Sequence, residues 1–245
     1  MLEAYPLNFG ATSKFCEWCP CRLRKLCLLN ERTVNAANAL SKIVKIHKFP
    51  RRKSLFIAGD DFNNIYTIKS GIVKTYMLDE DGTEQVIDFH LPGDVIGLDA
   101  IAKFKHPTSA ITLKKSTICE LPYQRFIELC DSAPELYFAI ANQLSSSLQR
   151  TQHLLMIINH KTAEERLAFF LLDFSYRLHL IDLSPVDFQL KISRAEIGNY
   201  LGLASETISR IFTHFEKEGL IHVKGKNIHI KDINGLINRG SHYTP

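Results

Sequence analysis

Apolar and polar residues alternate with a period of two between residues 45 and 122. Glycine-containing turns separate the alternating runs, a combination typical of short strands joined by tight turns. Strands of this length and spacing predict a small antiparallel barrel or roll, with a β-sandwich of no particular function as the alternative. The clearest runs are Ser54–Ile57, Ile65–Ile68, Ile72–Tyr76 and Gln85–Phe89.

The pattern changes to that of a long helix between Pro134 and Asn159, where there is no glycine and no internal proline. Its apolar positions recur in steps of three and four, and most residues between them are polar. Such a narrow seam is typical of a coiled-coil dimer, because a helix packed on its own domain needs a wider apolar face. Thr151 is a polar residue within the seam, so we expect the two helices to associate only marginally. The seam positions are Ala141, Leu144, Leu148, Thr151, Leu155 and Ile158.

The last third of the chain contains the pattern of a helix-turn-helix. Ser193 and Glu196 have the spacing of a capping box, which predicts a helix over Arg194–Leu201 that ends at Gly202. A second helix is expected from Ser205 to about Glu218. The residues that follow, 220–230, form two strand-like runs around a basic Lys-Gly-Lys-Asn turn, which predicts a wing.

In such a motif the second helix lies in the major groove, with its first residues against the base edges. An arginine suits guanine O6 and N7, a glutamate accepts from cytosine N4, and wing lysines suit phosphates. A winged helix used for protein contacts is the alternative. The expected DNA-contacting residues are Ser205, Glu206, Ser209 and Arg210 on the helix, and Lys224 and Lys226 on the wing.

Composition places the 245-residue chain among ordinary globular proteins, since 45% of residues are hydrophobic and 23% are charged. The elements together predict an α+β protein. The net charge of +4 allows a nucleic-acid partner without arguing for one. No apolar run approaches the ~20 residues that span a bilayer, and the first residues lack the pattern of a signal peptide. We therefore expect a soluble, cytoplasmic protein with no membrane partner.

Four of the six cysteines lie within one short segment, CEWCPCRLRKLC, at positions 16–27. Without a secretion signal, such crowding suggests a metal more than disulfides. The spacing alone leaves an iron–sulfur cluster and a structural zinc about equally matched, with a thiol–disulfide switch behind them. Taken alone, Cys119 in its strand-like run is expected to be a buried thiol, and Cys130 is expected to serve packing.

The order of barrel, long helix and winged helix resembles the cyclic-AMP receptor (Crp/Fnr) superfamily over nearly the whole chain. Within it the chain is most similar to the oxygen-sensing branch of the fumarate and nitrate reduction regulator (FNR). The matching stretches are FHLPGDVIGLDAI, STICELP, KTAEERLAFFL and IGNYLGLASETISRIF.

The resemblance implies a non-enzymatic regulator of anaerobic transcription, a global activator in type. Proteins of this branch bind an oxygen-labile [4Fe–4S] cluster, dimerise when it is intact, and recognise palindromes of TTGAT half-sites in double-stranded DNA. Glu206, Ser209 and Arg210 match the base-contacting residues of the family. The acidic hairpin 79–84 matches a region that touches RNA polymerase, although a solvated turn is an equal alternative.

The resemblance also implies a division of the chain into a cysteine arm (1–30), a β-roll sensor (31–132), a dimerisation helix (133–160) and a winged helix-turn-helix (161–245). Cys27 and Cys119 match family ligands. The family spacing Cys-x2-Cys-x5-Cys is altered here, because Trp18 stands where the first cysteine of that register is expected. Four of five cysteines are therefore expected as ligands: Cys16, Cys19, Cys21, Cys27 and Cys119.

Other sensors of this superfamily are the nearest alternatives. A cyclic-nucleotide sensor needs an arginine to hold the phosphate, but Thr108 stands in that place, so no cyclic nucleotide is expected. A haem sensor could use His90 or His106 as a ligand, yet no pair of axial ligands stands out. A regulator with a structural zinc or a thiol switch remains the alternative from another class.

Overall fold

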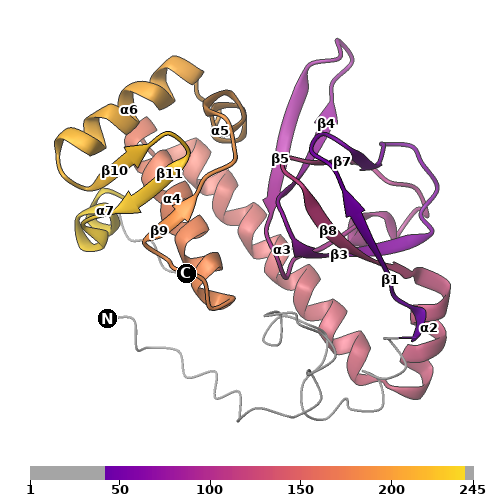
Figure 1. Ribbon diagram of the computed structural model, residues 1–245. Coiled ribbons are helices and arrows are strands. Elements are labelled where there is room, and N and C mark those ends of the chain that lie inside the picture. Colours follow the sequence, from indigo (N-terminus) through magenta and orange to yellow (C-terminus); the bar gives the residue numbers. More distant parts are fainter. Residues whose placement is uncertain (1–41, 241–245) are drawn as a thin grey trace.

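The computed structural model describes residues 42–240, which form two bodies joined by one long helix (Figure 1). The whole predicted arm (1–30), with the cysteines at positions 16, 19, 21 and 27, lies outside the described residues. The first body is a roll of two four-stranded antiparallel sheets, ordered β1-β8-β3-β6 and β2-β7-β4-β5. Its strands are β1 (Lys45–Phe49), β2 (Ser54–Phe56), β3 (Asn64–Ser70), β4 (Val73–Leu78), β5 (Glu84–His90), β6 (Val95–Ile96), β7 (Ser109–Thr112) and β8 (Ser116–Pro122).

The roll closes around side chains from alternate strand positions. Ile68, Val73 and Ile118 are fully buried between the two sheets, as the period-two pattern requires. The backbone at Gly71 approaches Ser116 so closely that only glycine fits, because a Cβ at this position would lie 2.0 Å from the Ser116 Oγ. A short 3₁₀ turn over Leu98–Ala100 and helix α2 (Tyr123–Ser132) cover one end of the roll.

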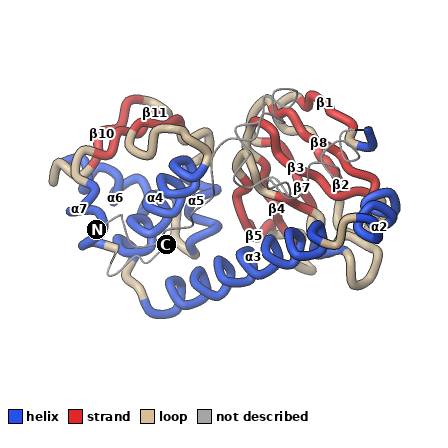
Figure 2. The backbone as a smooth tube through the Cα atoms, turned by 90° about the horizontal axis from the view of Figure 1, so that it is seen from below, coloured by secondary structure: helices blue, strands red, loops and turns tan. Residues whose placement is uncertain are grey.

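Helix α3 (Glu135–His160) is 26 residues long and passes along both bodies (Figure 2). Its bounds match the expected helix to within a residue. Helix α4 (Ala163–Leu180) follows after a sharp turn and begins with a capping box between Thr162 and Glu165. The chain thus returns from the long helix directly into the core of the second body.

The second body is a winged helix-turn-helix. Helix α5 (Arg194–Leu201) has the predicted capping box, and Gly202 ends it in the left-handed conformation at a φ of +65°. Helix α6 ends one residue earlier than expected. The remaining elements are β9 (Asp187–Gln189), α6 (Ser205–Lys217), β10 (Ile221–Lys224), β11 (Asn227–Ile230) and α7 (Ile233–Arg239). The α+β class, with a roll, a long helix and a winged helix-turn-helix, is confirmed.

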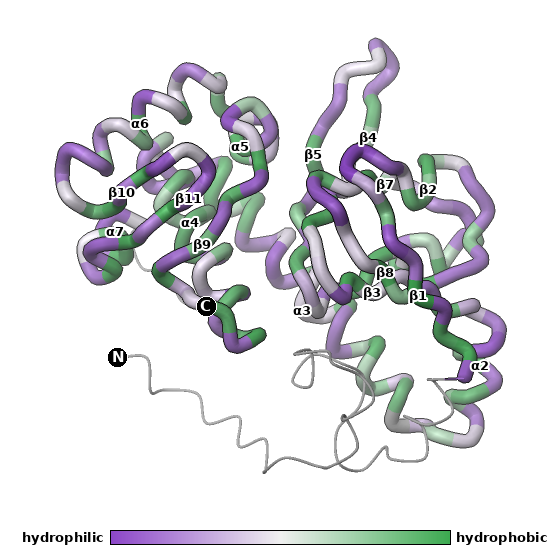
Figure 3. Tube along the Cα trace, viewed as in Figure 1, coloured by the Kyte–Doolittle hydropathy of each residue, from purple (hydrophilic) through white to green (hydrophobic). Residues whose placement is uncertain are grey.

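The two bodies share one apolar core rather than meeting only through α3. Phe89 of the roll packs edge-on against Phe170 of α4 and Tyr200 of α5. The β4–β5 hairpin, which projects beyond the roll in Figure 3, also reaches α5. There, the Asn199 side chain accepts the Val86 N–H at 2.6 Å and donates to the Glu84 carbonyl at 2.6 Å. The helix-turn-helix is therefore held against the roll by specific contacts.

Within residues 42–240, no helix combines the length and the apolar character needed to cross a membrane.

Candidate nucleic-acid interface

Helix α6 separates its buried and exposed residues cleanly. Ile208, Phe212 and Phe215 face the core of the winged domain and are at most 3% exposed. Glu206, Ser209 and Arg210 lie on the exposed face, and Ser205 at the first turn is half-buried. The predicted base-contacting side chains therefore share one accessible face, as a helix that enters a major groove requires.

A shallow groove of about 540 Å³ runs beside α6 and reaches the first turn of α4. Arg210 lines it together with Thr213 and Lys217 of α6 and Glu164 of α4. The carboxylate of Glu164 is engaged by Arg239 at 2.9 Å, which offsets its charge. Hydroxyl and cationic side chains along such a groove suit a phosphate backbone that passes next to the recognition helix.

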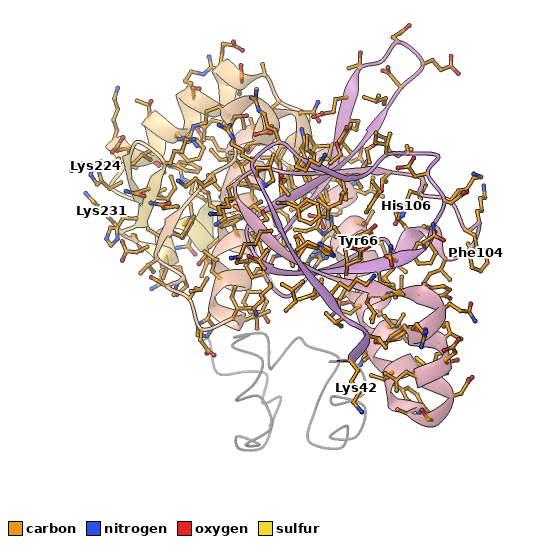
Figure 4. The ribbon with its side chains drawn as sticks, turned by 45° about the vertical axis from the view of Figure 1, so that its right-hand side comes forward. Lys42, Tyr66, Phe104, His106, Lys224 and Lys231 are labelled. Carbon is orange, nitrogen blue, oxygen red and sulfur yellow. The ribbon has the colours of Figure 1, made fainter. Side chains whose placement is uncertain are left out.

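The wing is an antiparallel hairpin whose register pairs Lys224 with Asn227. Lys224 and Lys226 are exposed at its tip, and Figure 4 shows Lys224 on the outer side of the winged domain, away from the roll. Among the described residues neither lysine forms an ion pair within 4 Å. Both charges are thus available to an external anion.

A cluster of buried charges lies where the roll, α3 and α4 meet. Arg177 of α4 pairs with Asp94 of the roll, donates to the Phe89 carbonyl at 2.7 Å, and lies 3.4 Å from Asp173. Arg150 of α3 lies 3.5 Å from Asp88 of β5. One ionic network therefore connects the roll, the long helix and α4.

Opposite charges favour the ionised forms of Asp94 and Arg177 despite their burial. Burial raises the pKa of Asp94, but Arg177 and Arg150 outweigh that effect, so the pKa is lowered. Burial also raises the pKa of Asp173, and here the arginines only partly oppose it. The pKa of Arg177 is raised because Asp94, Asp173 and Asp88 overcome the cost of its burial. Arg177 lies within 4.0 Å of all three carboxylates, and Arg150 supports Asp88 and Asp94 from α3.

The predicted seam on α3 is largely uncovered. Leu144, Leu148 and Leu155 are 42%, 58% and 56% exposed, and Phe138 one turn earlier is 72% exposed. Ile158 differs from the others, because it is half-buried and lies near Gly202 of the same chain. Leucines aligned along one exposed helix face favour a protein partner that covers them.

Cys119 lies in the middle of β8, paired with Ile46 of β1 and Thr67 of β3, and is partly exposed. Cys130 is fully buried in α2, where burial raises the pKa of its thiol to about 11. Cys119 is accordingly the better thiolate ligand of the two. No three metal-binding side chains converge within residues 42–240, so the described residues do not by themselves complete a metal site around Cys119.

Sequence reasoning missed the residues that connect the domains. No sequence pattern marked Asn199 in the first helix of the motif. Arg177 and Asp94 lie 83 residues apart in the chain, so no local pattern connects them. The only signal available was the presence of charged residues inside apolar runs, such as Asp173 and Arg177 within α4. A charge in a buried run predicts a partner but does not identify it.

Known protein families match both bodies of the chain. A family model for a cyclic nucleotide-binding domain matches residues 46–133, and a model for a Crp-like helix-turn-helix domain matches residues 165–239. The solved structure of FixK2 from Bradyrhizobium japonicum has a TM-score of 0.76, covers 82% of this chain and 100% of that chain, and is 24% identical. The fold and the exposed face of α6 define a DNA-binding transcription regulator, not an enzyme.

The chain belongs to the Crp/Fnr family, in the branch of the anaerobic regulators. The anaerobic regulatory protein of Haemophilus influenzae is 41% identical over 222 residues, which covers 89% of this chain and 85% of that protein. The fumarate and nitrate reduction regulatory protein of Escherichia coli K12 is 36% identical over 223 residues, which covers 91% and 89% respectively.

Proposed function

We propose that this regulator senses oxygen through a [4Fe–4S] cluster and, as a homodimer, binds palindromes of TTGAT-type half-sites. The partly exposed thiol of Cys119 on the roll is the observation that carries the cluster assignment, together with the cysteine-rich segment 16–27. Cys27 and Cys119 are the firmest ligands, and two of Cys16, Cys19 and Cys21 complete the set. The bound cluster supplies the reaction with oxygen. The relatives named as anaerobic regulators support this assignment.

Thiolates of residues 1–30 that share a ligand set with Cys119 would tie this arm to the sensor domain, residues 31–132. The free energy of metal binding then also drives the ordering of the arm. The ordered arm favours pairing of the dimerisation helix, residues 133–160, through Leu144, Leu148 and Leu155. When the arm is no longer tied to the sensor domain, the population shifts to monomers, since only the dimer is stabilised by contacts along the seam.

Pairing places two copies of the DNA-binding domain, residues 161–245, on one operator. Two recognition helices about 34–36 Å apart contact half-sites one helical turn apart, which requires a palindrome. Arg210 and Glu206 contact base edges, Ser205 and Ser209 contact base or phosphate, and the wing lysines contact phosphates. The exposed face of α6 supports these roles.

The acidic tip of the β4–β5 hairpin, residues 79–84, is exposed and is proposed to contact RNA polymerase. A cyclic nucleotide is not expected, because Thr108 donates to the Asp99 carboxylate at 2.9 Å where a phosphate-binding arginine is needed. A carboxylate in that position repels a phosphate.

Anaerobic purification with counts of iron and acid-labile sulfide tests the proposal. About four of each per chain, together with DNA binding that is lost in air, is the expected result. Zinc in place of iron would favour a structural zinc site, and a haem spectrum would favour a haem sensor. A colourless, iron-free protein that binds its operator equally well in air would overturn oxygen sensing by a cluster.

A further inference from the structure

The outer face of the wing sheet brings two histidines together. In the three-stranded sheet β10-β11-β9, His222 pairs with His229, and His229 pairs with Asp187 on the next strand (Figure 1). These three side chains are exposed, whereas the alternate positions Ile221 and Ile228 are buried. The row therefore lies on the solvent side of the sheet.

Each imidazole bonds through Nδ1 to a carboxylate on its outer flank. His222 Nδ1 lies 2.8 Å from Glu216 Oε1, and His229 Nδ1 lies 2.6 Å from Asp187 Oδ1. Glu216 also accepts the Val223 N–H, at 3.1 Å, on the open edge of β10. That backbone bond and the contact with His222 lower the pKa of Glu216, which keeps it ionised.

An ionised carboxylate only accepts hydrogen bonds, so Nδ1 of each histidine donates. Each neutral ring then keeps a lone pair on Nε2. Because Nδ1 and Cδ2 lie on opposite sides of an imidazole, turning Nδ1 toward the outer flank turns Nε2 toward the partner ring. Among residues 42–240, the polar contacts of both rings are made by Nδ1. His222 and His229 line a common groove together with Asp187 and Gln189.

We propose that His222 and His229 form a binding site for a divalent transition-metal ion of the Zn²⁺ type. Imidazole is a preferred ligand for these ions. The carboxylate–histidine pairs match the outer contacts that usually orient metal-binding histidines and fix the tautomer. No third His, Cys, Asp or Glu converges here in the described part of the chain, so water completes the coordination.

A phosphate group is the competing ligand, since the groove also includes Lys224. The carboxylates of Glu216 and Asp187 stand directly beside the two rings and disfavour an anion. The same carboxylates favour a cation. The charges around the pair therefore support a metal over a phosphate.

Equilibrium dialysis of the full-length protein against Zn²⁺, with metal counted by atomic emission, tests this site. Any zinc that the cysteines bind is common to every variant, so differences between variants isolate the wing. His222→Gln and His229→Gln are each expected to lose one zinc equivalent or weaken it at least tenfold. Glu216→Gln is expected to weaken the same equivalent by about 10- to 100-fold.

His47→Gln is the matched control. His47 is 47% exposed, as is His229, and lies 3.1 Å from the Glu120 carboxylate, but its cross-strand partner is Ile118. This variant should keep every zinc equivalent. Unchanged binding in both wing variants, or an equal loss in His47→Gln, would overturn the site. Either result would leave the proposed DNA binding and oxygen sensing standing, because neither proposal rests on His222 or His229.

Discussion

His90 illustrates how burial changes the behaviour of a single polar residue. The ring is 8% exposed, its Nε2 contacts the Thr75 hydroxyl at 2.9 Å, and its Nδ1 has no partner among the described residues. Burial lowers the pKa of His90 below its usual 6.5, although Asp88 and Asp94 oppose this and the two arginines reinforce it. The folded protein therefore holds His90 in its neutral form.

The sign of the pH dependence follows from this lowered pKa. As the pH falls below about 6.5, the unfolded chain takes up a proton before the folded chain does, so the free energy of unfolding decreases. His90 contributes at most about 1.4 kcal/mol per pH unit. Denaturant titrations at pH 7.5, 6.5 and 5.5 give the free energy of unfolding at each pH. This free energy should change less with pH in His90→Gln than in the parent, whereas the exposed variant His160→Gln should match the parent. Equal slopes in all three proteins would contradict this account.

Arg210 is the residue expected to determine one base of the operator. Arg210→Ala should weaken operator binding by about 1–3 kcal/mol and relax preference at one base pair, because it removes a bidentate contact to guanine. Lys224→Ala should instead weaken all sequences similarly and reduce the salt slope by about one. Binding titrations against a set of single-base operator variants distinguish the two effects. Unchanged preference in Arg210→Ala would refute its base contact.

At the scale of the elements, helix α3 combines an exposed apolar face with a connection to the second body. The helix exposes a row of leucines that residues 42–240 leave uncovered, while Leu154 nearer its end packs against the core that includes α4 and the winged domain. In the second half of the helix, Arg150 joins the buried ionic network. One helix thus has a surface suited to pairing and a fixed connection to the DNA-binding domain.

Leu148→Asp should prevent pairing, because it places a charge in the middle of the apolar seam. Sedimentation of the anaerobic protein should change from dimer to monomer, and operator binding should fall with it. Ser146→Asp adds the same charge to the same helix at an exposed position outside the seam, and should leave the dimer intact. A dimeric Leu148→Asp protein would place the interface elsewhere.

Arg177→Met should destabilise the protein by about 3–5 kcal/mol, since it leaves Asp94 and Asp173 buried without their nearest cation. Asp94→Asn in the same chain should recover part of this loss, because it removes one of the unpaired charges. Thermal or denaturant unfolding measures both. If Arg177→Met unfolds at the same denaturant concentration as the parent, the network contributes little.

At the scale of the whole molecule, the proposed signal runs from the cysteine arm to the operator through contacts between domains. Phe89, Phe170 and Tyr200 make one continuous core from the roll into the DNA-binding domain. Asn199 fixes the hairpin of the roll to α5. A rigid connection of this kind means that sensing need only alter pairing, without a large rotation inside each chain.

Substitution of the cysteines tests the signal as a whole. Cys27→Ser and Cys119→Ser should each lose iron, dimerisation and operator binding, whereas one of Cys16, Cys19 and Cys21 should tolerate serine. Cys130→Ser is the control, because its thiol is buried and lies outside the expected ligand set. Iron content and oligomeric state of anaerobic samples give the result. Full iron content in Cys119→Ser would remove the roll from the ligand set.

Local patterns predicted many of the elements correctly. Period-two alternation marked the strands of the roll, and the Ser193–Glu196 capping box with Gly202 marked both ends of α5. The spacing of apolar residues marked α3 and its seam. These succeed because propensity, capping and periodicity depend on residues a few positions apart.

The amino-acid sequence by itself determined the order of roll, long helix and winged helix, the exposed face of α6, and the cysteines available as ligands. Only the tertiary structure decided that Arg177 holds three carboxylates together, that Asn199 bonds to the β4–β5 hairpin, and that His222 faces His229. Such pairs join residues that are distant in the chain or on different strands. Their energies depend on burial and geometry, which no local pattern of residues encodes.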